Sequence, residues 1–171
     1  MRLKDKVAII TGGSRGIGFA TADAFLREGA KVAVAASSEK NAEAAVEKLK
    51  AIHPDAEVVG ISPNLGSFES VKEEFDKVEK QFGRIDILVN NAGVSESTPF
   101  TSYTEADFDR VIDLNVKGVF NATRAVVDGM IKNHSGVVLN TSSMVSISGQ
   151  PSGFAYPASK FAVNGTTISL A

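Results

Sequence analysis

The feature that most constrains the fold is a regular alternation of short, apolar, β-branched runs with longer segments of helical periodicity. Strands are predicted at Val7–Thr11, Lys31–Ala36, Glu57–Ile61, Ile85–Asn90 and Gly136–Thr141. Helices are predicted at about Ile17–Glu28, Glu39–Lys50, Phe68–Phe82 and Glu105–Lys132, with a last helix beginning near Tyr156. Strand, helix and strand in repetition with short connections predict a doubly wound α/β fold, in which a parallel sheet carries helices on both faces.

Length and composition narrow the class of protein. The 171 residues are predicted to form a single domain, 1–171. A net charge of −2 makes no electrostatic case for nucleic acid or an anionic membrane as partner. Without Cys and with only two His, the chain offers no disulfide, no thiolate metal site and no His-rich metal site. Neither a signal peptide nor a membrane-spanning run is recognisable, so we expect a soluble, cytoplasmic protein.

The last part of the chain is almost free of charge. From Asn133 to Ala171 the only charged side chain is Lys160. We expect this segment to be largely buried, either within the fold or in a subunit interface. A single ammonium retained in such surroundings indicates a specific partner and a functional role for Lys160.

A glycine-rich turn lies directly between the first predicted strand and the first predicted helix. It reads Thr11-Gly12-Gly13-Ser14-Arg15-Gly16-Ile17-Gly18. Glycines at this place let the backbone approach a pyrophosphate, whose charge then meets the N-terminus of the helix. A tight turn without a ligand is the alternative, but the position after the first strand of a doubly wound pattern favours phosphate binding.

Three motifs in register resemble the short-chain dehydrogenase/reductase family. They are T-G-x-x-x-G-x-G at 11–18, Asn90-Asn91-Ala92-Gly93 after the fourth strand, and Tyr156-x-x-x-Lys160. The resemblance covers Lys6 to Ala171 and implies a Rossmann-type fold that transfers hydride between a nicotinamide cofactor and a secondary alcohol or carbonyl. The resemblance also implies that residues after the predicted strands contact the cofactor: Gly12, Ser14, Arg15, Gly16, Ile17, Gly18, Asn64, Asn90, Ala92 and Gly93.

Tyr156 and Lys160 have a chemistry that can be argued from their spacing. Four residues apart on a helix, the two side chains share one face. A phenol has a pKa near 10, and a nearby ammonium lowers that value by favouring the phenolate. Tyr156 is therefore suited to exchange a proton with a substrate oxygen. The resemblance adds that Tyr156 and Lys160 also contact the cofactor, Lys160 through the nicotinamide ribose.

Two further catalytic residues follow from the resemblance. The family's serine lies 13 positions before its tyrosine, which selects Ser143 to hydrogen-bond the substrate oxygen; its neighbour Ser142 would face the opposite way along a strand. Asn115 matches the family's helix asparagine, which binds a water that links the lysine to solvent. A buried structural hydrogen bond is the alternative role for Asn115.

The end of the second strand predicts which nicotinamide cofactor is bound. An NAD site places an acid there for the ribose 2′-hydroxyl, but this chain has Ala36. Ser37 and Ser38 offer hydroxyls to a 2′-phosphate, and Arg15 adds a guanidinium with planar donors. We therefore expect NADP(H) to be favoured over NAD(H).

Substrate and extent of the protein are less constrained. Ser95–Thr101 and Val145–Phe154 are expected to line the substrate pocket, and the absence of charge in the stretch 149–154 favours a small hydrophobic alcohol or ketone. Residues 156–165 resemble bacterial hydroxysteroid dehydrogenases. A 3-oxoacyl-type reductase is the nearest alternative, although the Arg-rich segment that such enzymes carry after N-N-A-G is absent. A truncated, non-catalytic cofactor-binding protein is the other.

The resemblance also bears on completeness and assembly. Relatives continue beyond the helix that carries Tyr156, so we expect a five-stranded sheet of order 3-2-1-4-5, truncated after that helix, and a fragment of a longer protein. The resemblance also implies a homodimer or homotetramer packed through the helix 105–132 and the last helix, unless a further C-terminal segment covers these helices. Apolar residues nearly encircle the middle of the first of these helices: Val111, Leu114, Gly118, Ala122 and Ala125 on one face, and Val116, Val119, Phe120, Val126 and Val127 on the other.

Overall fold

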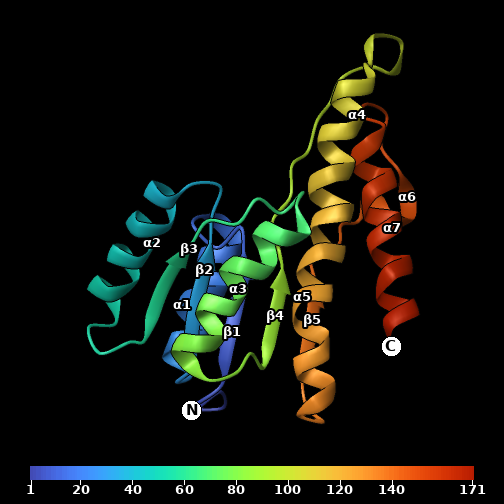
Figure 1. The fold of residues 1–171 in the computed structure, drawn as a ribbon. Coiled ribbons are helices and arrows are strands. Elements are labelled where there is room, and N and C mark those ends of the chain that lie inside the picture. The colour runs from blue at the N-terminus through green and yellow to red at the C-terminus, as the bar shows by residue number, and fades with distance from the viewer.

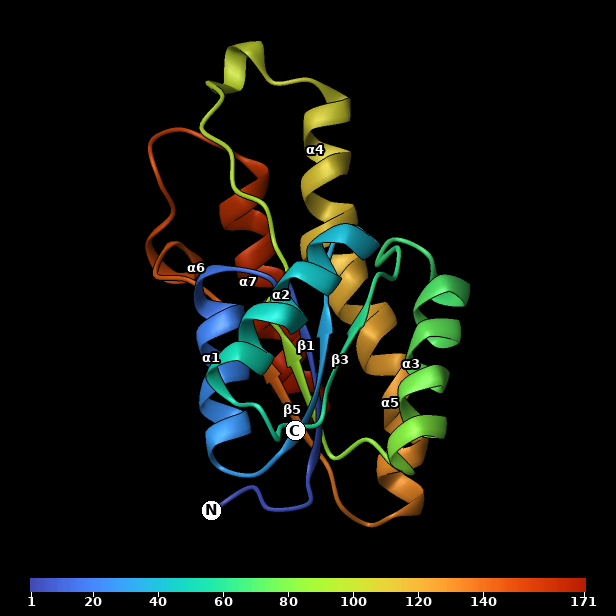
Figure 2. The ribbon, with the colours of Figure 1, turned by 90° about the vertical axis from the view of Figure 1, so that its left-hand side faces the viewer.

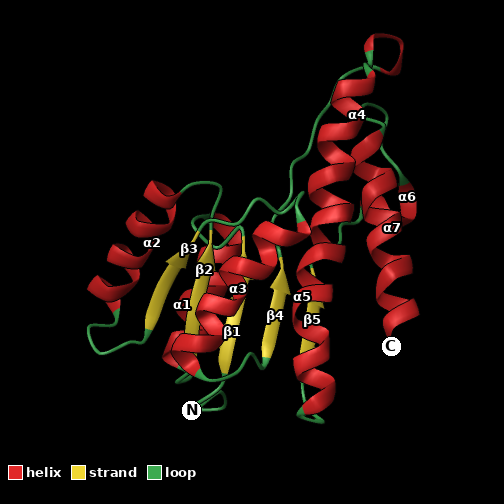
Figure 3. Cartoon of the chain, viewed as in Figure 1, coloured by secondary structure: helices red, strands yellow, loops and turns green.

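A computed structural model describes all residues from Met1 to Ala171 and contains one five-stranded parallel sheet. Figure 1 shows the sheet with its helices, and in Figure 3 all five strands point the same way. The strand order is β3-β2-β1-β4-β5, as the sequence predicted. The strands are β1 (Val7–Thr11), β2 (Lys31–Ala35), β3 (Val58–Ile61), β4 (Ile87–Asn90) and β5 (Val137–Asn140).

Helices cover both faces of this sheet, so the predicted doubly wound, Rossmann-type fold is confirmed. Figure 2 shows α1 on one side of the sheet and α3 and α5 on the other. The helices are α1 (Gly16–Arg27), α2 (Glu39–Ile52), α3 (Phe68–Phe82), α4 (Glu105–Ile112), α5 (Gly118–Lys132), α6 (Val145–Ser148) and α7 (Ala155–Leu170), with a 3₁₀ turn at Phe100–Ser102 and a π turn at Asp113–Lys117.

Alternating side chains of the central strand divide the core into two clusters. Ile9 packs with α3 and α5 around Phe75, whereas Ile10 packs with α1 and α2 around Leu26 and Leu49. Both isoleucines are fully buried. At about 1.5–3 kcal/mol for each large apolar side chain buried, these two layers hold the sheet rigid. The carboxyl ends of the strands are thereby fixed in relation to one another.

The predicted helix 105–132 forms one continuous rod, but it contains a π turn that the sequence analysis missed. The rod runs from α4 through Asp113–Lys117 into α5. Other elements of the same chain cover most of the apolar residues around this rod, because α5 packs on both β4 and α3 and the π turn packs on α7. Val119 and Val126 are buried, and only Phe120 among them is strongly exposed, at 59%.

The prediction of a largely buried C-terminal segment is wrong within this chain. Ala155 and Val163 are buried, but eight large apolar side chains from β5 to the end of α7 are about half exposed or more: Val137, Leu139, Met144, Ile147, Phe154, Phe161, Ile168 and Leu170. The physical reason is that β5 pairs only with β4 and forms an edge of the sheet. Absence of charge marks a surface that avoids water, whether or not this chain covers it. No helix is long and apolar enough to cross a lipid bilayer.

Candidate functional site

The glycine turn after β1 has a backbone that side chains would obstruct. Gly12 has φ +63°, and a Cβ there would stand 2.8 Å from the Cα of Ala92. At Gly18 a Cβ would overlap the carbonyl oxygen of Gly12. Both positions therefore require glycine, since α1 packs directly against the turn and the turn against the segment after β4.

A threonine and an asparagine fasten this turn to the end of β4. The Thr11 hydroxyl accepts hydrogen bonds from the N–H groups of Asn91 and Ala92, each at 3.0 Å. Asn91 Nδ2 donates in return to the carbonyl oxygens of Thr11, at 3.1 Å, and Gly12, at 3.2 Å. Thr11 and Asn91 stood inside the recognised motifs, but the sequence analysis assigned neither a role. They fix the spacing between the first and fourth strand ends.

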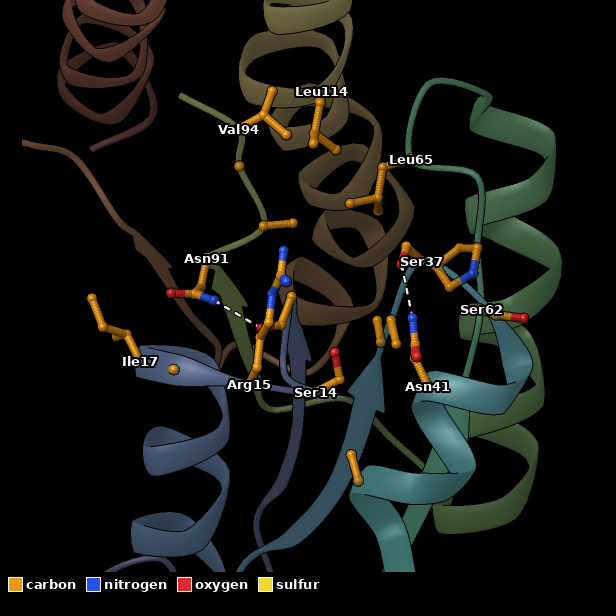
Figure 4. Close-up of a pocket in the computed structure, with 18 of the residues that line it drawn as sticks. Ser14, Arg15, Ile17, Ser37, Asn41, Ser62, Leu65, Asn91, Val94 and Leu114 are labelled. Carbon is orange, nitrogen blue, oxygen red and sulfur yellow. Dashed lines mark hydrogen bonds between the residues drawn. The ribbon is translucent and has the colours of Figure 1, made fainter. Parts of the chain in front are cut away.

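A cavity of about 810 Å³ opens over the carboxyl ends of the strands. In Figure 4 Ser14, Arg15 and Ile17 lie on its α1 side, Ser37 and Asn41 on its α2 side, and Val94 and Leu114 at the opposite end. This is the crevice where the strand order reverses and where doubly wound sheets bind ligands. Nine predicted cofactor residues line it: Gly12, Ser14, Arg15, Gly16, Ile17, Ser37, Asn64, Ala92 and Gly93.

The cavity has the properties of an anion site. Helix α1 begins at its edge with no acid in the first turn and with no side chain capping its free N–H groups. Those groups and the helix dipole favour a phosphate. Arg15 and Lys48 are the only charged residues in the lining, and no acid accompanies them. The glycine cradle and the uncapped helix therefore fit a dinucleotide. Lys48 and Asn41 were not found from the sequence, because their places depend on how α2 packs.

Five predicted cofactor residues do not line this cavity: Gly18, Ser38, Asn90, Tyr156 and Lys160. Asn90 is 3% exposed and its Nδ2 donates to Thr123 Oγ1 at 3.1 Å and to Asn140 Oδ1 at 2.9 Å, so it joins β4 to α5 and β5. Ser38 instead caps α2, accepting from the N–H of Asn41 at 3.3 Å. Gly18 is buried under the turn. Gly18, Ser38 and Asn90 thus make structural contacts, their contacts with a cofactor stay predictions, and Asn91 lines the cavity in addition.

Lys160 and Tyr156 lie on the first two turns of α7. Lys160 is 5% exposed, and its Nζ donates to the carbonyl oxygen of Thr141 at 2.7 Å. Burial lowers the pKa of the Lys160 ammonium. Its Nζ is 5.7 Å from the centre of the Tyr156 ring. The specific partner expected for this lysine is thus a main-chain oxygen just past β5.

Gly93 connects this pair to the cavity. A Cβ at Gly93 would stand 3.8 Å from Lys160 Nζ and 3.2 Å from Asn115 Oδ1. Asn115 lies in the π turn and is 1% exposed. Its Oδ1 accepts from the N–H of Val94 at 2.9 Å, while its Nδ2 donates to the Val94 carbonyl at 2.8 Å and to Ser159 Oγ at 3.0 Å. The Asn115 side chain thus joins the segment after β4 to α7, the structural alternative for this residue.

The two serines after β5 have different partners. Ser142 Oγ donates to the carbonyl oxygen of Lys160 at 3.4 Å, so it faces α7. Ser143 Oγ accepts a weak hydrogen bond from the N–H of Val145 at 3.4 Å at the start of α6. No protein acceptor engages the Ser143 hydroxyl hydrogen.

A second cavity, of about 620 Å³, adjoins Tyr156. Its wall combines Ser95, Glu96 and Ser97 with Gln150, Pro151 and Ser152, so both segments expected there contribute. Glu96 and the hydroxyl and amide groups dominate this wall, so it is more polar than the uncharged stretch 149–154 alone. Phe154 is absent from the wall; it packs against Phe100, Tyr103 and Phe108, at ring distances of 5.1, 6.5 and 6.2 Å.

Several known proteins have sequences similar to this chain over nearly all of its length. The family model described as short chain dehydrogenase matches residues 6–171. A 3alpha-hydroxysteroid dehydrogenase of Mediterraneibacter gnavus is 52% identical over all 171 residues, which correspond to 68% of its length. A 3-oxoacyl-[acyl-carrier-protein] reductase FabG of Thermotoga maritima is 41% identical over the same residues and 69% of its length.

Solved structures agree with the fold. Levodione reductase matches 99% of this chain with a TM-score of 0.94 and 36% identity, and NAD⁺-bound xylitol dehydrogenase matches all of it with a TM-score of 0.95 and 33% identity. The chain spans 66% and 65% of their respective lengths. Since the family model covers almost the whole sequence and the motifs occupy one site, the chain belongs to the short-chain dehydrogenase family.

Proposed function

We propose that this protein is an NADP(H)-dependent oxidoreductase that interconverts a secondary alcohol and a ketone, with a hydroxysteroid as the favoured substrate. The observation that carries the proposal is the placement of Tyr156 and buried Lys160 between the two cavities, with Lys160 reaching Gly93 on the cofactor side. A nicotinamide cofactor, when bound, supplies or accepts the hydride. Tyr156 would exchange the proton of the substrate oxygen, and Ser143 would donate a hydrogen bond to that oxygen.

The steroid class is favoured by similarity and by the chemistry of the second cavity. The relative from Mediterraneibacter gnavus, at 52% identity, is a 3alpha-hydroxysteroid dehydrogenase. A wall with serine hydroxyls and a glutamine amide suits a substrate that carries hydroxyl groups beyond the reacting one. A 3-oxoacyl reductase is the second candidate, supported by the 41% identity to the FabG protein.

Turnover assays on the full-length protein test the proposal. We expect NADP⁺ reduction with a 3α-hydroxysteroid and NADPH oxidation with the corresponding 3-ketosteroid. A higher kcat/KM with a 3-oxoacyl thioester would favour the second candidate. Cofactor binding without turnover of either probe would support a non-catalytic binding protein and contradict the proposed activity.

We expect NADPH to bind more tightly than NADH, because Ala36 and Ser37 stand where an acid would repel a 2′-phosphate and Arg15 and Lys48 are the charges of the cavity. Arg15→Ala should lower the ratio of the NADH Kd to the NADPH Kd by about tenfold, or ~1.4 kcal/mol, since a hydrogen bond to a charged group is worth about 1.5–3 kcal/mol. Isothermal titration with both cofactors measures this.

Lys40→Ala is the matched control for the titration, because Lys40 is an exposed cation of α2 outside the cavity. It should leave the difference between the cofactors unchanged. A tenfold preference of the unmodified protein for NADH would contradict the proposed cofactor. The xylitol dehydrogenase neighbour is NAD⁺-bound, so the titration distinguishes a preference for NADPH from a preference for NADH.

For assembly we propose a homodimer or homotetramer packed through α5 and α7. Phe120, Phe161 and Ile168 on these helices are 59%, 51% and 78% exposed, a surface that favours association. Sedimentation at micromolar concentration should therefore show an oligomer. A monomer that binds no hydrophobic dye would contradict the proposal, because its apolar residues would then be covered without a second copy.

A further inference from the structure

Glu96 joins the loop after β4 to the start of α7, although 60 positions separate it from Tyr156. Figure 2 shows the chain after β4 rising past the upper end of α7. The main-chain N–H of Tyr156 donates to Glu96 Oε1 at 3.1 Å. Gln150 Nε2 donates to the Glu96 carbonyl oxygen at 3.4 Å, and the N–H of Gly153 donates to the Thr98 carbonyl at 3.2 Å. Three hydrogen bonds thus tie the two segments together, one accepted by the Glu96 carboxylate and two by main-chain carbonyls.

Helix α7 has no cap of its own. Its N-cap residue, Phe154, makes no side-chain hydrogen bond, and its first turn contains no acid. The free N–H groups at a helix start need acceptors, and the helix dipole favours an anion there. The Glu96 carboxylate, from another part of the chain, supplies an acceptor for one of these N–H groups and the negative charge. Gly153 makes room for it, because a Cβ there would overlap the Glu96 carbonyl oxygen and stand 2.8 Å from its Oε2.

The second carboxylate oxygen also bears on this contact. Glu96 Oε2 is buried without a hydrogen-bond partner, and so is the hydroxyl of Tyr103. Burial raises the pKa of Tyr103, and the neighbouring Glu96 carboxylate raises it further. Tyr103 therefore stays a phenol next to the carboxylate. Its ring belongs to the aromatic group around Phe154, which fixes the residue just before α7.

From this geometry we infer that Glu96 is a positioning residue for Tyr156: its carboxylate anchors the first turn of α7 and so sets the position of the Tyr156 hydroxyl beside the second cavity. The inference rests on the proposed role of Tyr156 as proton donor. Glu96 lines the second cavity and not the cofactor cavity, so a substitution of Glu96 can change turnover of the substrate without changing the affinity for the cofactor.

The test compares Glu96→Ala and Glu96→Gln in the full-length protein, with a 3α-hydroxysteroid and NADP⁺ as probes. Glu96→Ala should lower kcat by about 10–100-fold, because a misplacement of about 1 Å can cost 10²-fold, while the Kd for NADPH changes less than about twofold. Glu96→Gln keeps an acceptor for the Tyr156 N–H and should recover most of kcat. Glu105→Ala removes an exposed acid from the first turn of α4, where Thr104 and Asp107 already form the cap, and should behave as the unmodified protein.

Amide hydrogen exchange provides a readout that does not need turnover. In Glu96→Ala, exchange at the start of α7 should become about tenfold faster, as for the loss of ~1.4 kcal/mol of local stability. Unchanged exchange would overturn the anchor. Faster exchange with unchanged kcat would overturn the positioning role. Absence of turnover in the unmodified protein would overturn the proposed function and the positioning role that rests on it, and exchange would still decide whether Glu96 anchors the helix.

Discussion

Tyr156→Phe is expected to reduce turnover by about 10²–10⁴-fold, the range typical of general acid–base groups. The substitution removes one hydroxyl and keeps the ring, which is half-buried at the start of α7. Besides Tyr156, the only ionisable side chain in the wall of the second cavity is Glu96, whose carboxylate already accepts a hydrogen bond from the Tyr156 main chain. Initial rates with a 3α-hydroxysteroid and NADP⁺ measure the effect.

The cofactor provides the internal control for this variant. Tyr156 does not line the cavity assigned to the cofactor, so we expect the Kd for NADPH to change little. The melting temperature should also stay close to that of the unmodified protein, because the ring remains. A loss of turnover below about tenfold would show that another group donates the proton, and Glu96 would be the first to test.

The fold could be predicted because its determinants are local in sequence. Strand and helix periodicities appear within each segment, and helix ends have their own signals. Predicted and observed bounds coincide for α3, where Ser67 accepts from the N–H of Ser70 and Gly83, at φ +88°, ends the helix. The glycine turn is local in part: Gly12 and Gly16 have positive φ, which favours glycine, whereas Gly18 needs glycine because it packs against the Gly12 carbonyl.

The side-chain contacts that the sequence did not indicate join distant segments of the chain. Adjacent Asn90 and Asn91 have the same chemistry, and only the packing of α5 and β5 against β4 turns Asn90 away from the cavity. Glu96 carried no signal in sequence, because its partner is the main chain of Tyr156. The π turn around Asn115 was also hidden, since its residues continue a helical pattern on both sides.

The charge-poor C-terminal segment shows a different limit. A sequence reveals that side chains avoid water but not which surface covers them. Lys160 is the one position in this segment where the prediction was specific, and the structure buries it with Thr141 as its partner. The neighbouring apolar side chains of α7, such as Phe161 and Ile168, are instead exposed. We propose that an interface between subunits covers these exposed apolar side chains.

Lys160→Met is expected to lower both turnover and cofactor affinity, because two roles are proposed for one ammonium. Its Nζ lies 5.7 Å from the centre of the Tyr156 ring, and a Cβ at Gly93, in the wall of the cofactor cavity, would stand 3.8 Å from it. Tyr156→Phe, by contrast, should affect turnover alone. Initial rates and NADPH titrations on both variants measure the difference. A fall in turnover with unchanged NADPH affinity would contradict the ribose role of Lys160.

The same substitution should change how stability depends on pH. Burial lowers the pKa of Lys160 below its ordinary 10.5, so between the lowered value and 10.5 the unfolded chain binds more protons than the folded one. The free energy of unfolding gains a contribution from this group that increases as pH rises through that window. Urea unfolding between pH 8 and about 10.5 should show this contribution in the unmodified protein and not in Lys160→Met, whose side chain has no proton to lose. An identical pH dependence in both proteins would mean that Lys160 has the same pKa in the folded and in the unfolded chain. The buried hydrogen bond to Thr141 would then offset the whole cost of burying the charge.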